Sequence, residues 1–172
     1  MNGEPIHLDA PGLTGLRIAR AEAGDAAELL VLQRACWVAE ALANDTLAIA
    51  ALHETLDDVE RGISEHQTWV VCDGPRLVGS VRATMAGDAW EIGRLMVAPD
   101  LGGRGLGRFL LAWIEDHRPE AATRFRLFTG ARSARNLRLY GSAGYVLDRT
   151  TDGVAHLSKP AGNRRAAPRV ER

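Results

Sequence analysis

The amino-acid sequence predicts an α/β domain with a mixed, mostly antiparallel central sheet that is flanked by helices on both faces. Three observations support this prediction. Strand-like and helix-like segments alternate along the chain, the turn Asp73-Gly74-Pro75 joins two β-rich runs, and a glycine-rich segment joins a strand to an amphipathic helix. The 172 residues suffice for one domain that buries its own core.

The first half of this domain is expected to contain a strand, two helices and a hairpin. The run 16–20 is β-rich, and a helix capped by an aspartate should extend over 25–37, because its apolar residues recur at helical spacing. A second helix is predicted at 47–63, where leucine and valine side chains share one face. The hairpin comprises strands 68–72 and 76–85 on either side of the Asp-Gly-Pro turn.

The second half alternates more regularly between strands and helices. A strand at 90–97 stops just before a proline, and an amphipathic helix at 106–117 follows the glycine-rich segment. A strand at 125–129 precedes a helix at 133–143, which begins at a serine cap and ends before Gly144, a residue type that accepts the left-handed conformation. Two short strands close the domain: 145–147 and 154–157.

Both ends of the chain differ from the alternating region in composition. Residues 1–15 contain prolines and glycines with little periodicity and are expected to form a flexible leader. Residues 159–172 are rich in proline, alanine and arginine and are expected to form a disordered basic tail. The domain itself is assigned to residues 16–158.

Composition and charge exclude several classes of function. The formal net charge of -1 provides no general attraction to nucleic acid or to an anionic membrane. No segment approaches the ~20 consecutive apolar residues of a membrane-spanning helix. The cysteines Cys36 and Cys72 are far apart, and the histidines lack metal-ligand spacing. We therefore expect a cytoplasmic protein with no metal site, no nucleic-acid partner and no membrane partner.

The glycine-rich segment is the most informative part of the sequence. It places four glycines between a strand and the start of a helix: Gly102, Gly103, Gly105 and Gly107. Glycines allow the backbone to approach a ligand closely, and the free N–H groups at a helix N-terminus attract anions. Arg104 and Arg108 add positive charge at the same place. The segment therefore predicts a phosphate or pyrophosphate ligand.

Two nucleotide-binding motifs fit this segment poorly. A P-loop requires Lys and then Ser or Thr after the last glycine, where this chain has Arg108 and Phe109. A dinucleotide-binding fold needs an acidic residue at the end of the next strand, where this chain has Thr129 and Gly130. The third alternative is a glycine turn that binds no ligand.

Two runs of residues carry a family resemblance. The first is Arg94–Pro99 followed by Gly103–Gly107, and the second is Thr129–Tyr145, whose helix contains Leu-Tyr and ends at Gly-Tyr. In this order they resemble the acetyl-CoA signature and the later helix of the GNAT superfamily of N-acetyltransferases. The chain departs from the family pattern at Gly102, where Gln or Arg is usual, and at Ser133, where many relatives have Asn. The resemblance implies the GNAT acyl-CoA N-acyltransferase fold.

The resemblance also implies acetyl-CoA as cosubstrate and assigns roles to residues. In this family an acceptor amine attacks the thioester directly, and a tyrosine at the position of Tyr140 protonates the departing thiolate. Some relatives have a general-base glutamate at the position of Glu91, which could equally be an ordinary exposed residue of the strand. The implied cofactor contacts come from the strand end, the glycine turn and the later helix: Leu95, Met96, Val97, Gly102, Gly103, Arg104, Gly105, Leu106, Gly107, Arg108, Ser133 and Asn136.

The acceptor is expected to be a primary amine, on either a small molecule or a protein. Residues 35–60 carry several acids and no lysine or arginine, which favours a cationic acceptor or, alternatively, a solvated helix face. Several relatives dimerise through their late strands, so the resemblance is compatible with a homodimer. The alternative function is a non-catalytic acyl-CoA-binding regulatory module that retains the glycine turn.

Overall fold

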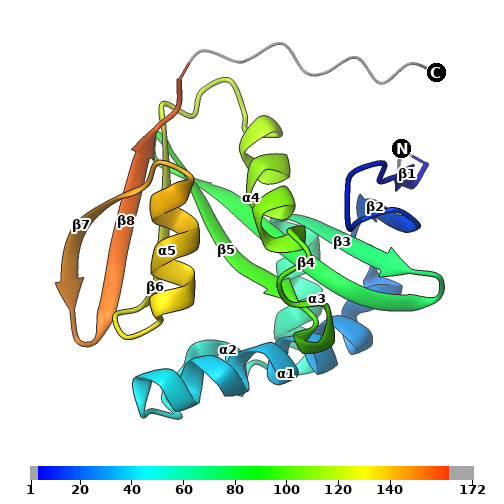
Figure 1. The fold of residues 1–172 in the computed structure, drawn as a ribbon, viewed down its shortest axis with the longest axis horizontal. Helices are drawn as coiled ribbons and strands as arrows, with labels where there is room; N and C mark the ends of the chain where they lie inside the picture. The colour runs from blue at the N-terminus through cyan, green and yellow to red at the C-terminus, as the bar shows by residue number, and fades with distance from the viewer. Residues whose placement is uncertain (1–3, 163–172) are drawn as a thin grey trace.

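The computed structural model describes residues 4–162 as a single eight-stranded sheet with helices on both faces (Figure 1). The strand order is β1-β2-β3-β4-β5-β6-β8-β7. All neighbouring strands are antiparallel except β5 and β6, which are parallel. The predicted mixed, mostly antiparallel sheet is therefore confirmed.

The elements follow one another in the predicted order. The strands are β1 Ile6–His7, β2 Leu16–Arg20, β3 Gln67–Asp73, β4 Arg76–Ala86, β5 Ala89–Val97, β6 Arg124–Gly130, β7 Val146–Thr151 and β8 Val154–Pro160. The α-helices are α1 Ala26–Asn44, α2 Ala50–His53, α3 Leu56–Glu65, α4 Leu106–Asp116 and α5 Ala134–Ser142. Two 3-10 helices are η1 Ala23–Asp25 and η2 Pro99–Leu101.

Two of the helix predictions need correction. α1 continues beyond Trp37 and stops where Asp45 adopts a left-handed conformation with φ of 52°. The helix predicted at 47–63 is interrupted between α2 and α3, because Thr55 starts a new helix with a capping box. The Asp58 N–H donates to the Thr55 hydroxyl at 3.3 Å, and the Thr55 N–H donates to the Asp58 carboxylate at 2.9 Å.

The structure also differs from the expected leader and tail. Residues Ile6–His7 pair with β2, and Leu8 and Leu13 are buried in the core, so apolar side chains hold this segment to the domain. Gly12 lies against the glycine-rich segment, because a Cβ on it would be 2.9 Å from the Arg104 carbonyl oxygen. At the other end β8 includes the first two residues of the expected tail, and the part of that tail after residue 162 lies outside the described residues.

The core lies between the sheet and two helical layers. α4 packs directly on the backbone of β4, since a Cβ on Gly79 would lie 3.2 Å from Leu106 and 3.3 Å from Leu110. The Trp90 indole N–H anchors β5 to the same helix by donating to the Ile114 carbonyl at 3.0 Å. α1 and α3 cover the opposite face, and α5 lies beside α4 over β6 and β8 (Figure 1).

Candidate active site

The site begins where β5 and β6 separate. The two strands pair only from Ala89 to Glu91 on β5, and beyond this point they diverge (Figure 1). The pairing of β4 with β5 also shifts register between Ser80 and Arg82, opposite Arg94, which has a φ of 48°. Positive φ is uncommon for a residue other than glycine, and such a bulge bends the strand and redirects its peptide groups. The far half of β5 therefore has a free edge toward β6.

Backbone groups on this free edge can be assigned from the hydrogen bonds of β5. The Ala98 N–H donates to the Val78 carbonyl of β4 at 2.8 Å, and successive peptide groups of a strand point to opposite edges. Leu95 and Val97 therefore direct their N–H and C=O groups toward the opening, whereas Met96 directs its groups toward β4. In this geometry Leu95 and Val97 present peptide groups to the opening, and Met96 contributes a buried side chain.

The glycine turn forms an open cradle at the N-terminus of α4. Gly103 and Gly105 have φ of 85° and 90°, and a Cβ on either would meet no atom within 4 Å. No side chain caps α4, whose first N–H groups have no partner within the helix. The cradle thus provides free donors, positive helix-dipole charge and open space, which is what a phosphate group requires. The residues present fit the pyrophosphate of acyl-CoA.

Charges around the cradle also favour an anion. Arg104 and Arg108 are exposed beside the turn. Asp100 is the acid of this segment, and Arg76 neutralises it with two hydrogen bonds of 2.7 and 2.8 Å. The hydrogen bond from Arg76 lowers the pKa of Asp100 to about 2, so the carboxylate stays ionised and paired. Leu106 and Gly107 contribute backbone here, and the Leu106 side chain is buried under the sheet.

Tyr140 lies on α5 with its side chain in the core. Its ring packs edge-on against Tyr145 at 6.1 Å between centroids. Burial raises the pKa of the Tyr140 phenol far above its usual value, and the charge of Glu40 raises it further. The phenol is therefore protonated at neutral pH, which is the form that a general acid requires.

Glu40 is a site residue that sequence reasoning did not single out. It lies on α1 and accepts hydrogen bonds from the Ser133 hydroxyl and, at 2.9 Å, from the Asn136 side-chain amide. Asn136 also donates to the Thr129 hydroxyl at 3.1 Å. The structure therefore joins Ser133 and Asn136 through Glu40, a residue far away in the sequence, and the charge of Glu40 also acts on Tyr140. The acidic composition of 35–60 was the available signal, and it did not indicate which acid faces α5.

Glu91 occupies a different position from this cluster. It lies at the closed end of the opening, where β5 still pairs with β6, and forms an ion pair with Arg126 at 3.0 Å. Its side chain is 39% exposed. The hydrogen bonds and ion pairs of the described residues do not connect Glu91 to Tyr140 or to Glu40. The two predicted catalytic residues are therefore held by separate networks.

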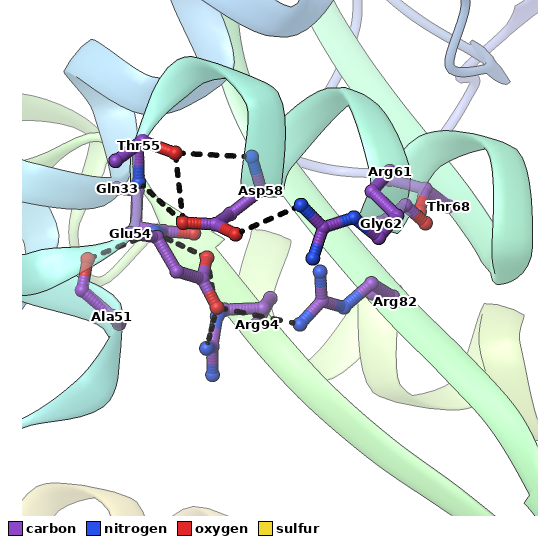
Figure 2. A network of polar contacts seen from close by, with 10 residues as sticks. All are labelled: Gln33, Ala51, Glu54, Thr55, Asp58, Arg61, Gly62, Thr68, Arg82 and Arg94. Atoms are coloured by element: carbon purple, nitrogen blue, oxygen red, sulfur yellow. Dashed lines mark hydrogen bonds and ion pairs between the residues drawn. The ribbon is translucent and has the colours of Figure 1, made fainter.

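A groove of about 450 Å³ lies on the α1 and α3 face of the sheet. Its lining combines acids and bases: His53, Glu54, Asp58, Arg61, Glu65, His66 and Arg82, together with Ala50 and Gly62. Figure 2 shows that Glu54 is the centre of the polar network beside it. Glu54 accepts from Arg94 and from the Gln33 amide at 2.8 Å, and Arg82 lies 3.8 Å away. Arg94 thus joins the bulge of β5 to the polar network beside the groove.

Sequence comparison identifies the family. The profile of the Acetyltransferase (GNAT) family matches residues 28–145, well over half of the chain. The chain belongs to the GNAT acetyltransferase family. The predicted class of enzyme, an acyltransferase that uses acetyl-CoA, is confirmed with it. A search of curated proteins found no match.

Solved structures share the fold at low sequence identity. PaiA N-acetyltransferase from Thermoplasma acidophilum, in complex with coenzyme A, has a TM-score of 0.75 at 14% identity, over 84% of this chain and 98% of that chain. The ribosomal-protein-S18-alanine N-acetyltransferase from Escherichia coli has a TM-score of 0.67 at 16% identity, over 90% and 99%. Spermidine N-acetyltransferase from Vibrio cholerae, in complex with CoA and spermine, has a TM-score of 0.64 at 17% identity, over 86% of this chain and 96% of that chain. These similarities confirm the GNAT fold.

Within residues 4–162, His, Cys, Asp and Glu side chains form no group of three that could hold a metal ion. In the same part of the chain, no helix has the length and apolar character needed to cross a membrane.

Proposed function

We propose that this chain transfers the acetyl group of acetyl-CoA to a primary amine by direct attack. The observation that carries the proposal is the junction of two features: the uncapped glycine cradle of α4 and the free edge of β5 beside it. One feature suits a pyrophosphate, and the other suits an extended chain with amide groups. Family membership supports the same reading.

The residues have distinct proposed tasks in the reaction. The cradle from Gly102 to Arg108 holds the pyrophosphate, and the peptide groups of Leu95 and Val97 hold the pantetheine arm and the thioester carbonyl. Acetyl-CoA supplies the acetyl thioester. When the amine nitrogen bonds to the carbonyl carbon and the carbon–sulfur bond breaks, Tyr140 gives its proton to the leaving sulfur.

Glu91 is the proposed base that takes the proton from the acceptor ammonium, directly or through water. Its partial exposure makes it accessible to water, and Arg126 keeps it close to β6. Water that reaches this exposed position would carry the proton away. Loss of the pH dependence of turnover in Glu91→Gln would support this role.

The proposed acceptor is a primary amine, carried either by a small molecule such as a polyamine or by a protein. Similar folds include an enzyme named for spermidine and one named for the alanine of ribosomal protein S18. The acids of residues 35–60 favour a cationic acceptor. We further propose a cytoplasmic location, and a homodimer through the exposed edge strand β7.

The test is calorimetric titration with acetyl-CoA followed by measurement of free CoA thiol in the presence of amines. The panel contains spermidine, spermine, aminoglycosides and peptides with a free N-terminal alanine. Saturable binding with acceptor-dependent thiol release is expected. Absence of binding would refute the acetyl-CoA site, and binding without release from any acceptor would favour a non-catalytic acyl-CoA-binding module.

A further inference from the structure

We infer that Arg135, in the first turn of α5, binds the phosphates of acyl-CoA and fills the space of the side chain that is missing at Gly102. The inference rests on the proposed function, because it completes the same cofactor site. Gly102 stands where the family signature has Gln or Arg, so the cradle lacks one polar side chain. Arg135 comes from a different helix on the other side of the opening.

The first observation is the contact between Arg135 and Gly102. A Cβ built on Gly102 would lie 3.2 Å from Nη2 and 3.6 Å from Nη1 of Arg135. Gly102 itself has φ of -59° and ψ of 143°, which any residue can adopt. The backbone therefore does not require glycine here. The guanidinium of Arg135 occupies the space into which a longer side chain would extend.

The second observation is that Arg135 is an exposed cation whose charge is available. Among residues 4–162 it takes part in no ion pair, whereas Arg76 neutralises Asp100 in the same turn. A guanidinium presents a planar set of donors that matches phosphate oxygens in a bidentate arrangement. Beside the free N–H groups of α4, it would add side-chain donors to the pyrophosphate site.

The third observation is that the charge of Arg135 also acts on a residue bound to the end of β5. Burial raises the pKa of the Cys36 thiol to about 11, and the hydrogen bond to Val97 and the charge of Arg135 act against this rise. Cys36 donates to the Val97 carbonyl at 3.2 Å, on the free edge of the strand. The guanidinium therefore contacts the turn at Gly102 and also acts electrostatically on a thiol that is bound to the strand end.

The experiment measures the Kd of CoA by calorimetry for wild type, Arg135→Ala and the control Arg138→Ala. Arg138 is exposed on the same helix, one turn further from the cradle. Loss of a charge-assisted contact predicts a roughly 10- to 100-fold higher Kd for Arg135→Ala, since such hydrogen bonds contribute about 1.5–3 kcal/mol. The Arg138→Ala variant should bind CoA like wild type, and both variants should retain the wild-type melting temperature.

A double-mutant cycle distinguishes phosphate binding from a structural role. Gly102→Arg alone should weaken CoA binding, because two guanidinium groups would compete for one space. Gly102→Arg combined with Arg135→Ala should bind CoA more tightly than either single variant, since the arginine is then supplied from the turn.

Two outcomes would overturn the inference while leaving the proposed function intact. These are unchanged CoA binding in Arg135→Ala and strictly additive losses in the double variant. Failure of the wild-type protein to bind CoA would instead refute the proposed function, and the inference with it.

Discussion

Replacing Glu54 should destabilise the protein more than any other single acid-to-alanine change on the groove. Glu54 accepts hydrogen bonds from Arg94 and Gln33 and faces Arg82 (Figure 2). The Arg94 and Arg82 side chains are 15% and 21% exposed, so water compensates little of their charge when Glu54 is removed. Removing one partner of a fully buried ion pair costs about 3–5 kcal/mol. The partial exposure of these side chains reduces the cost, and we expect Glu54→Ala to lose about 2–3 kcal/mol of unfolding free energy.

The substitution should also change the backbone of β5. Arg94 holds a left-handed φ of 48°, a conformation that costs about 1–3 kcal/mol and persists only when its surroundings enforce it. The ion pair with Glu54 and the contact with the Trp37 ring, 5.7 Å from the Arg94 guanidinium, are the visible constraints. Without Glu54 the bulge should relax. The edge of β5 that includes Leu95 would then lose part of its preorganisation.

The assay is urea denaturation at neutral pH, with Glu65→Ala as the matched control. Glu65 is exposed on the rim of the same groove, and we expect its replacement to change stability by less than about 0.5 kcal/mol. The denaturant slope should stay constant in both variants, because the fold is unchanged. Equal stability of Glu54→Ala and the control would refute the argument that this carboxylate compensates two buried cations.

The ion pair of Glu54 also gives a pH prediction with a definite sign. Burial tends to raise the pKa of Glu54, but hydrogen bonds from Arg94 and Gln33 and the charges of both arginines outweigh it and lower the pKa. A lowered folded-state pKa means that the stabilisation is complete above the unfolded value of about 4.3 and disappears as the pH falls through the folded value. The difference in unfolding free energy between wild type and Glu54→Gln should therefore shrink below about pH 4.

Three further substitutions test separate parts of the molecule. Tyr140→Phe should lower kcat by about 10²- to 10⁴-fold and leave the Kd of CoA unchanged, and undiminished turnover would remove Tyr140 from the role of acid. Gly105→Val should abolish CoA binding in calorimetry while the chain stays folded, because it strains a φ of 90° and fills the cradle; normal binding would contradict the placement of the pyrophosphate. Gly130→Ala should lower stability in urea by about 1–3 kcal/mol, because its Cβ would lie 2.1 Å from the Asn44 side chain; wild-type stability would contradict the packing of α1 on β6.

The sequence predicted best those features that depend on neighbouring residues. The hairpin of β3 and β4 follows from one Asp-Gly-Pro turn, and the glycine cradle follows from local conformational freedom. The start of α3 was also visible, since Thr55 and Asp58 have the spacing of a capping box, but the apolar pattern across it favoured one continuous helix. The burial of Leu8 and Leu13 had no periodic signal, because both lie in an irregular segment whose Gly12 lies against the distant Arg104.

The site depended more on long-range contacts and was predicted less completely. Glycine and strand positions of the cofactor site follow from the local motif. The partners of Glu40 do not, because Ser133 is 93 positions away and only the folded sheet brings α1 to α5. In the same way Arg135 is an unremarkable surface residue in the sequence until the structure places it on Gly102. Side-chain chemistry indicated the type of site, and topology decided which residues share it.

α1 connects the two sides of the opening between β5 and β6. Near its start, Gln33 donates to the Ala51 carbonyl and to Glu54, which holds Arg94 on β5. In the middle, Cys36 contacts the Val97 carbonyl. Near its end, Asn44 accepts from the Arg132 N–H at 3.0 Å and donates to Ser133 at 2.9 Å, on the side of β6. Because one rigid helix is fixed to both strands, the width of the opening depends on the position of α1. Substitutions at either end of α1 should therefore affect binding at the free edge of β5 without touching the ligand.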